Sequence, residues 1–339
     1  MSVRILLLGA LFSCATEHES AEADPVLPPD VMVSTPVVED IRCPGAPAAG
    51  ASTGWRHTAS RFIVELGDPR HRGIDLIATP HDATHTISGK LTYGTIEKDL
   101  EDEDVELFAC IDARWQPLGA ARTDGDGRFA LTLTGDERLP AGMRDLYVSV
   151  RGDRTGAAFI GFVAPKGSPI VVSDVDGTLT GSENAYPLSL ALGGDVPAHA
   201  TAPETLMSAA AHGVSVIYIS ARGDRFTHDT RTWLAAKGFP RGPVRLPTSI
   251  ITMPGEDTID FKSNALASLA AFKMLAGFGN RGTDIAAYTE AGLTPNRIFI
   301  KLPEFTDEVA GELMAGNATG FDLYDRVRTD NLPVLMPTP

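Results

Sequence analysis

The chain has 339 residues, of which 43% are hydrophobic and 22% charged, and its formal net charge is −15 at pH 7. The length allows two domains with tails, and the composition is typical of a globular protein rather than a disordered one. The negative charge argues against a nucleic-acid partner, because a polyanion would be repelled.

Residues 1–14 have the order of a signal segment. A basic Arg4 is followed by an apolar run at residues 5–12 and by Ser13 before Cys14. This order is similar to a bacterial lipoprotein signal, which implies a lipid anchor on Cys14 and a periplasm-facing place in the bacterial cell envelope. The alternative is a cytoplasmic protein. No apolar run reaches the roughly 18 residues that a transmembrane helix needs, so we expect no such helix.

The next segment, residues 15–55, is acidic and rich in proline and predicts a disordered tether. Residues 56–165 then predict an all-β domain. Short runs of β-branched and aromatic residues, several of them alternating with polar residues, lie at 62–64, 74–77, 86–91, 105–108, 129–133, 146–150 and 159–163. Such a series, with no helical stretch between the strands, favours an immunoglobulin-like sandwich.

The cysteines, Cys14, Cys43 and Cys110, fit no zinc motif, so we expect no structural zinc. With Cys14 lipidated, Cys43 and Cys110 could form a disulfide in an oxidising compartment. Cys110 lies in an apolar run, where a lone buried thiol is equally common. The sequence leaves both alternatives open.

Strands and helices alternate in residues 166–339. Continuous β-branched runs at 170–172, 216–219 and 298–300 predict strands that are covered on both faces. Helices are predicted at 201–213, where Thr201 and Glu204 form a capping box, and at 224–237, 261–275 and 283–291. This alternation predicts an α/β fold with a doubly wound parallel sheet.

An acidic pair lies where the first of these strands ends. Asp174 and Asp176 are followed by Gly177 and Thr178, and the carboxyl ends of parallel strands form the active site in open α/β sheets. Two carboxylates this close repel each other by roughly 4 kcal/mol at an effective dielectric constant near 20. Such a pair therefore needs a cation or a shared proton.

Further polar residues follow the pair in chain order. Ser220 ends the next strand, Lys262 opens a later helix, and Asn280 and Asp284 lie at a strand-to-helix turn. Taken singly, each of these could be an ordinary turn residue or a solvated side chain. Between residues 222 and 301 there are 11 Lys and Arg against 7 Asp and Glu. This local excess suits an anionic substrate, although scattered solvated charges would give the same count.

The ordered set resembles the four motifs of the haloacid-dehalogenase superfamily. Residues 174–180, 218–222 and 278–288 are similar to the catalytic region of lipin-type phosphatidate phosphatases, and the similarity extends from residue 170 to about 304. That family also carries an immunoglobulin-like sandwich beside its catalytic domain. The resemblance implies a Mg²⁺-dependent phosphomonoester hydrolase for residues 166–339.

The resemblance also implies a role for each residue. Asp174 would be the nucleophile that becomes phosphorylated, and Asp176 the general acid and base. Ser220 and Lys262 would bind the phosphoryl oxygens. Substrate contacts would come from Thr178, Arg222 and Arg281, although each arginine could instead form a surface ion pair. Mg²⁺ would be held by Asp174, the main-chain carbonyl of Asp176, Asp284 and the nearby Asn280. Many members have Asp at the place of Asn280, which departs from the pattern.

The substrate implied by the resemblance is phosphatidate or a related lipid phosphate at a membrane surface. Two alternatives remain open. One is a phosphatase of soluble or protein-bound phosphate. The other is a module that binds phosphatidate without cleaving it, although relatives of that kind lack the acidic pair that Asp174 and Asp176 form here.

Overall fold

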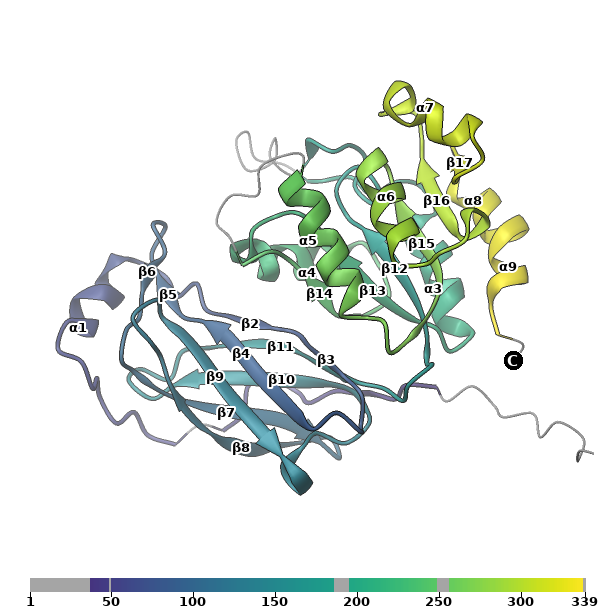
Figure 1. Cartoon of the computed structure of the whole chain (residues 1–339). Helices are drawn as coiled ribbons and strands as arrows, with labels where there is room; N and C mark the ends of the chain where they lie inside the picture. Colours follow the sequence, from purple (N-terminus) through teal and green to yellow (C-terminus); the bar gives the residue numbers. More distant parts are fainter. Residues whose placement is uncertain (1–36, 49, 186–194, 249–255, 338–339) are drawn as a thin grey trace, which may run out of the picture. The chain divides into compact units, whose positions relative to one another are not determined.

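A six-stranded sheet organises the first half of the described chain (Figure 1). The computed structural model describes residues 37–48, 50–185, 195–248 and 256–337, so the predicted signal and most of the predicted tether lie outside it. The strand order is β3-β11-β10-β7-β8, and β1 pairs with β10. The strands are β1 Asp40–Ile41, β3 Leu76–Ala78, β7 Asp104–Ile111, β8 Arg114–Arg122, β10 Gly142–Val150 and β11 Gly156–Val163.

Two smaller sheets complete this β-rich region. One has the order β2-β4-β9, and the other pairs β5 with β6. Their strands are β2 Arg72–Ile74, β4 Thr84–Lys90, β5 Thr92–Tyr93, β6 Lys98–Asp99 and β9 Arg128–Thr134. Alternate side chains of the facing sheets, such as Ile87 and Phe129 from one and Leu107 and Phe159 from the other, share one buried cluster. Burial of one face of each sheet explains the alternation in the sequence.

A disulfide joins Cys43 to Cys110 of β7, with the two Cα atoms 5.7 Å apart. The sequence left this pairing open, and the structure gives the answer. The bridge ties the segment that follows β1 to β7 of the six-stranded sheet.

Two predictions in the β-rich region are wrong in detail. Residues 62–64 form no strand but lie in helix α1 Ser60–Ile63 and the 3₁₀ turn η1 Val64–Leu66. A three-residue apolar run cannot distinguish a strand from a helical turn. The predicted strand at 74–77 is divided at Asp75, whose buried carboxylate accepts the N–H groups of Ile160 and Val244. The prediction also missed β8, an edge strand whose mostly exposed residues do not alternate between polar and apolar.

The second half is built on a parallel sheet with the order β14-β13-β12-β15-β16-β17. Its strands are β12 Pro169–Asp174, β13 Ser215–Ile219, β14 Val244–Arg245, β15 Lys273–Gly279, β16 Ile298–Lys301 and β17 Thr319–Phe321. Its helices are α3 Ala202–Ala211, α4 Thr227–Ala236, α5 Glu256–Ala267, α6 Gly282–Glu290, α7 Thr306–Met314, α8 Tyr324–Arg326 and α9 Leu332–Leu335. Short 3₁₀ turns lie at Gly135–Glu137, Asp224–Phe226 and Pro295–Arg297, and a π-helical turn at Val327–Asn331.

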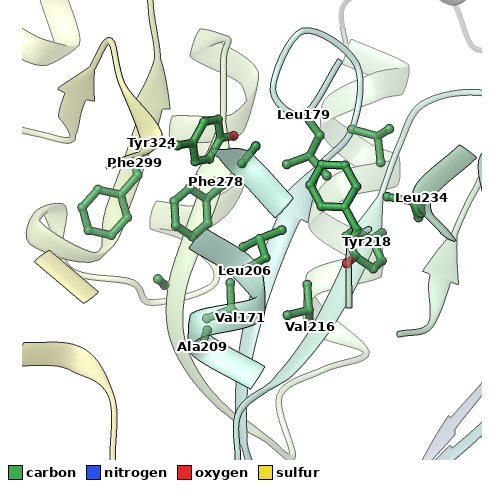
Figure 2. Packing of buried hydrophobic residues seen from close by; sticks show 14 of the residues in the cluster. Val171, Leu179, Leu206, Ala209, Val216, Tyr218, Leu234, Phe278, Phe299 and Tyr324 are labelled. Atoms are coloured by element: carbon green, nitrogen blue, oxygen red, sulfur yellow. The ribbon is translucent and has the colours of Figure 1, made fainter. Parts of the chain in front are cut away.

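Both faces of this sheet are covered. On one face, Val171 and Phe278 pack with α3, α4, α8 and α9, and Figure 2 shows Phe278 beside Phe299 and Tyr324. The Phe278 ring stacks on both, with centroids 5.3 and 6.1 Å away. On the other face, Val172 and Ile300 pack with α5, α6 and α7. Burial on both faces explains the continuous apolar runs of the central strands.

The predicted helix boundaries need three corrections. Thr201 precedes α3 with a left-handed φ of 59° and makes no side-chain cap, because an N-cap needs an extended backbone, so the predicted capping box is absent. The predicted helix at 224–237 begins with a 3₁₀ turn, and α4 starts at Thr227. The predicted helix at 261–275 ends at Ala267, since Lys273 begins the central strand β15. An Ala- and Leu-rich run suits both elements.

The β-rich region followed by a parallel sheet with helices confirms the coarse fold prediction. Its immunoglobulin-like topology and its exact domain boundaries stay predictions. Residues Thr35–Pro339 form one structural unit. Within the described ranges, no helix has both the length and the apolar content to cross a membrane.

Candidate active site

Asp174 is the last residue of β12, a central strand, and its side chain is almost fully buried at the carboxyl end of the sheet. Its Oδ1 accepts a hydrogen bond from Lys262 Nζ at 2.8 Å, and its Oδ2 accepts one from the Thr178 hydroxyl at 2.9 Å. Gly177, which lies in the turn between Asp174 and Thr178, has a φ of 69°. A Cβ there would lie 2.1 Å from Asn280 Nδ2, so this position requires glycine.

The Lys262 ammonium bridges two acidic residues. Its Nζ lies 2.8 Å from Asp174 Oδ1 and 2.5 Å from Asp284 Oδ1. The sequence suggested that Lys262 begins a helix, but α5 begins earlier and Lys262 lies within it. Asp284 is in the first turn of α6, and its Oδ2 accepts the backbone N–H groups of Asn280 and Arg281 at 3.0 and 3.1 Å. The turn after β15 therefore aims Asp284 at the end of β12.

Burial and charge act in opposite directions on these groups. Burial raises the pKa of Asp174 well above its ordinary value; the Lys262 ammonium opposes this rise, whereas Asp284 and Glu183 add to it. Burial alone would lower the pKa of Lys262, but the carboxylates of Asp174 and Asp284 raise it above its ordinary value. A further cation beside Asp174 would favour the carboxylate form that a nucleophile needs.

Asp176 has different surroundings. Its carboxylate accepts three hydrogen bonds from the Arg222 guanidinium at 2.5–3.0 Å and one from the Ser220 hydroxyl at 2.8 Å. Arg222 also donates to the Thr230 hydroxyl at 3.1 Å. Residues at the end of β13 therefore fix the orientation of Asp176, and its side chain remains 16% exposed.

Glu183 is a site residue that the sequence reasoning missed. Its Oε2 accepts a hydrogen bond from Asn280 Nδ2 at 3.0 Å. Burial raises the pKa of Glu183; the Asn280 hydrogen bond opposes the rise, and the nearby Asp176 adds to it. An acidic residue in a polar loop after the strand carries no distinctive sequence pattern, so only the fold could reveal that it faces Asn280.

The groups expected to contact substrate are bound within the protein here. The Thr178 and Ser220 hydroxyls are buried and donate to Asp174 and Asp176. Arg281 pairs with Glu308 at 2.8 Å and lies over the Phe305 ring, with its guanidinium carbon 4.1 Å from the centroid. Arg281 and the largely buried Arg222 therefore both form ion pairs, and a substrate contact by either arginine stays a prediction.

Three of the basic residues between positions 222 and 301 form ion pairs in the described structure. Arg231 pairs with Asp75, Lys237 with Asp195 and Arg241 with Asp145. Because an acidic partner offsets the charge of each of these three residues, their pairing does not support a surface that attracts an anionic substrate.

The donor atoms around Asp174 are compatible with Mg²⁺. Among the residues that the structure describes, no three His, Cys, Asp or Glu side chains are placed to hold a metal ion. Two carboxylates, those of Asp174 and Asp284, nevertheless gather around one cation, the Lys262 ammonium. The Asn280 amide oxygen lies 3.3 Å from the Thr178 hydroxyl that also bonds Asp174. Carboxylate and amide oxygens are ligands that suit a hard cation.

Asp174 thus lies at the end of a central strand of a parallel sheet, with Lys262 and Asp284 beside it. Residues 171–301 match the family model described as PITM 1-3, LNS2 domain. Residues 69–163 match the model described as PITM 1-3, beta-sandwich domain. The match to a β-sandwich accords with the shared core of the facing sheets.

Several curated relatives have names that refer to phosphatidylinositol transfer. The chain is 24% identical over 250 residues to membrane-associated phosphatidylinositol transfer protein 1 of Rattus norvegicus, covering 73% of this chain and 19% of that protein. It is 27% identical over 253 residues to the human protein 2, covering 73% and 18%. It is 26% identical over 234 residues to protein retinal degeneration B of Drosophila melanogaster, covering 68% and 18%. The chain spans about a fifth of the length of these relatives.

Solved structures of low similarity include two phosphatases. One is D,D-heptose 1.7-bisphosphate phosphatase from B. bronchiseptica complexed with magnesium and phosphate, with 12% identity, a TM-score of 0.36, and coverage of 49% of this chain and 99% of that one. The other is class C acid phosphatase from Bacillus anthracis, with 17% identity, a TM-score of 0.32, and coverage of 47% and 67%. TM-scores this low carry no argument about function.

The predicted location in the bacterial cell envelope is wrong. The similar curated proteins come from rat, human and fly and point to a eukaryotic protein. A short apolar run before a cysteine has low specificity, because many unrelated segments share that composition. Cys14 itself lies outside the described residues.

Proposed function

We propose that the chain is a Mg²⁺-dependent phosphomonoester hydrolase that acts through an aspartyl-phosphate on Asp174, with phosphatidate or a related lipid phosphate as substrate. The observation behind this proposal is the pair of unlike carboxylates at the end of β12. Asp174 is buried against Lys262, whereas Asp176 is partly exposed and held by Arg222. Two neighbouring carboxylates in different surroundings are suited to two different roles.

In the proposed reaction, an Asp174 carboxylate oxygen attacks phosphorus, and the bond from phosphorus to the alkoxide breaks. Asp176 gives a proton to that alkoxide and then takes one from the water that attacks phosphorus of the aspartyl-phosphate. The bond between phosphorus and the Asp174 oxygen then breaks, which frees the carboxylate and releases phosphate. Arg222 and Ser220 hold the Asp176 carboxyl group in place during both transfers. The Lys262 ammonium would bind a phosphoryl oxygen, for which it must release part of its contact with Asp174 or Asp284.

Mg²⁺ would be held by the Asp174 and Asp284 carboxylates, the main-chain carbonyl of Asp176 and the amide oxygen of Asn280. When bound, it would neutralise the repulsion between the Asp174 carboxylate and the phosphate. Glu183 accepts a hydrogen bond from Asn280 Nδ2, so the amide oxygen of Asn280 would point away from Glu183 and toward the proposed Mg²⁺ position. We therefore assign Glu183 a positioning role.

A lipid phosphate is favoured over a soluble one by the names of the curated relatives, which refer to phosphatidylinositol. The similarity between residues 174–180 and lipin-type phosphatases favours the same substrate class. Because the chain spans only about a fifth of those relatives, their activities remain proposals for this chain.

The test is release of phosphate from phosphatidate in mixed micelles, with Mg²⁺ and with a chelator. We expect release by the unaltered chain with Mg²⁺ only, and a loss of about a thousandfold or more in Asp174→Asn, because the nucleophile is removed. Activity that survives this substitution contradicts the nucleophile assignment. Turnover of soluble phosphate esters or phosphoproteins without turnover of phosphatidate contradicts the substrate assignment alone.

A second function, binding of phosphatidate without cleavage, is favoured by two observations. The relatives carry the names of transfer proteins rather than of hydrolases, and Lys262 already neutralises part of the charge of Asp174 and Asp284. Sedimentation with phosphatidate-containing vesicles separates the two functions. Vesicle binding without phosphate release, unchanged in Asp174→Asn, would favour the binding module.

A further inference from the structure

A cleft of about 480 Å³ lies between helix α4 and the strands β2 and β11, away from the Asp174 site. We call it the basic cleft and define it by the donor-bearing residues that line it: Arg70, Arg72, Arg225, His228, Arg231 and Thr232. None of the residues assigned to phosphoryl transfer lines this cleft. The cleft belongs to one structural unit, because both of its walls lie within residues Thr35–Pro339.

Ion pairs fix two of its arginines. Arg72, from β2, is 6% exposed and pairs with Asp224 at 3.0 Å and with Glu97 at 3.4 Å. Arg231, from α4, pairs with the buried Asp75 at 2.9 Å. These contacts hold the guanidinium groups in place, so the walls of the cleft are preorganised rather than assembled by a ligand.

Both of these arginines keep a buried donor that lacks an acceptor. In the described part of the chain, Arg72 Nε and Arg231 Nη1 are buried and have no hydrogen-bond partner. A buried donor without a partner costs about 1–3 kcal/mol. These two atoms are closed to solvent, so a ligand reaches them only after the side chains shift, whereas the planar fork of an exposed guanidinium suits phosphate oxygens directly.

Two further arginines line the cleft. Arg70 and Arg225 are exposed at the mouth of the cleft, and the Arg225 guanidinium carbon lies 4.5 Å from the centroid of the Phe226 ring. Asp229 is the one acidic residue among the described residues that line the cleft. Because carboxylates already pair with Arg72 and Arg231, the attraction for an anion comes from the exposed guanidinium groups of Arg70 and Arg225.

We propose that the basic cleft is a second anion site, which binds a phosphate group independently of the Asp174 site. The phosphate could belong to a lipid headgroup or to a soluble phosphate. The proposal goes beyond the phosphatase assignment, since it holds whether or not Asp174 is phosphorylated.

The test compares phosphate binding by charge-matched double variants of the full chain. We expect Arg70→Gln with Arg225→Gln to bind inorganic phosphate at least about tenfold more weakly in equilibrium dialysis, because two charged donors are lost. The matched control is Arg61→Gln with Arg114→Gln, which removes two exposed arginines outside the cleft. Hydrolysis of p-nitrophenyl phosphate should be the same in both double variants.

A second pair of variants avoids any change to the arginines. Ala235 lines the cleft on α4 and is exposed, so Ala235→Glu should weaken phosphate binding, whereas Ala235→Gln should not. Equal phosphate affinity in all variants, or no binding by the unaltered chain, overturns the proposal. If hydrolysis is absent but the binding difference is present, the phosphatase proposal alone has failed.

Vesicles of phosphatidylcholine with phosphatidate distinguish the two sources of the phosphate group. Weaker flotation of Arg70→Gln with Arg225→Gln than of its matched control would assign the cleft to a lipid headgroup. Equal flotation, together with weaker binding of inorganic phosphate, would assign it to a soluble phosphate.

Discussion

In the β-rich region the buried carboxylate of Glu103 is surrounded by donors, whereas in the α/β region the buried Asp174 shares one ammonium with a second acid. Glu103 accepts the backbone N–H groups of Arg56 and His57 at 3.0 and 2.8 Å and the Ser60 hydroxyl at 2.6 Å. Asp174 and Asp284 instead share Lys262. A carboxylate satisfied by backbone groups supports the fold, whereas crowded like charges are typical of a functional site.

The two buried carboxylates, Glu103 and Asp174, should respond differently when one of their hydrogen-bond donors is removed. Glu103 has several donors, so the removal of one leaves the others in place. Lys262 is the one cationic side chain within hydrogen-bond distance of Asp174 in the described structure. The pair of Asp174 and Asp284 therefore depends on a single residue for its balance of charge.

The largest effect on stability is expected for Lys262→Met. This change leaves two buried carboxylates without their cation and should lower the free energy of unfolding by about 3–5 kcal/mol, measured by urea denaturation. Added Mg²⁺ should restore part of the loss, because a cation that binds the folded state stabilises it. The matched control is Lys273→Met, at an exposed position, which should have little effect. Equal stability of the two variants would remove the contrast between the regions.

Loss of the disulfide should have the next largest effect, in the β-rich region. Cys43 and Cys110 are 67 residues apart, and release of a loop of that length corresponds to about 4 kcal/mol in the chain-entropy model. We expect Cys43→Ser with Cys110→Ser to unfold at correspondingly lower urea concentration, and a reducing agent to act on the unaltered chain alone. A reductant effect on the double variant would point to another cause.

A pH effect of about 3 kcal/mol is expected from His71 in the β-rich region. Burial lowers the pKa of His71 from 6.5 to about 4. Between these values the unfolded chain binds a proton that the folded chain does not, so stability should fall as the pH falls from 6.5 to 4. His71→Gln should remove this part of the pH dependence of unfolding, whereas substitution of the exposed His81 by Gln should leave it. An unchanged slope in His71→Gln would assign the effect to other groups.

The smallest effect is expected at an exposed ion pair of the α/β region. Arg281 and Glu308 are each about one-third exposed, and such pairs contribute about 1 kcal/mol or less. Arg281→Gln should therefore shift the unfolding midpoint only slightly, and high salt should reduce even that difference. If Arg281→Gln lowered the free energy of unfolding as much as Lys262→Met, exposed and buried ion pairs would not differ in their contribution to stability.

Local patterns accounted for the elements that form the frame of the site. The apolar runs of β12 and β13 and the turn after β15 could be predicted because each depends on neighbouring residues. The same patterns placed Asp174 and Ser220 at strand ends. They failed at residues 62–64, where the run is too short to separate a strand from a helical turn.

The amino-acid sequence by itself determined that a β-rich region precedes an alternation of strands and helices, and it placed Asp174 and Asp176 at the end of a buried strand. These features follow from side-chain periodicity and from turn residues, which act over a few neighbours.

Only the tertiary structure decided which groups meet. It brought Lys262 between Asp174 and Asp284, turned Glu183 toward Asn280, and paired Cys43 with Cys110. It also placed Arg72 near Arg231, more than a hundred residues later in the chain, in the walls of one cleft. Such contacts depend on how whole elements pack, which no short stretch of sequence encodes.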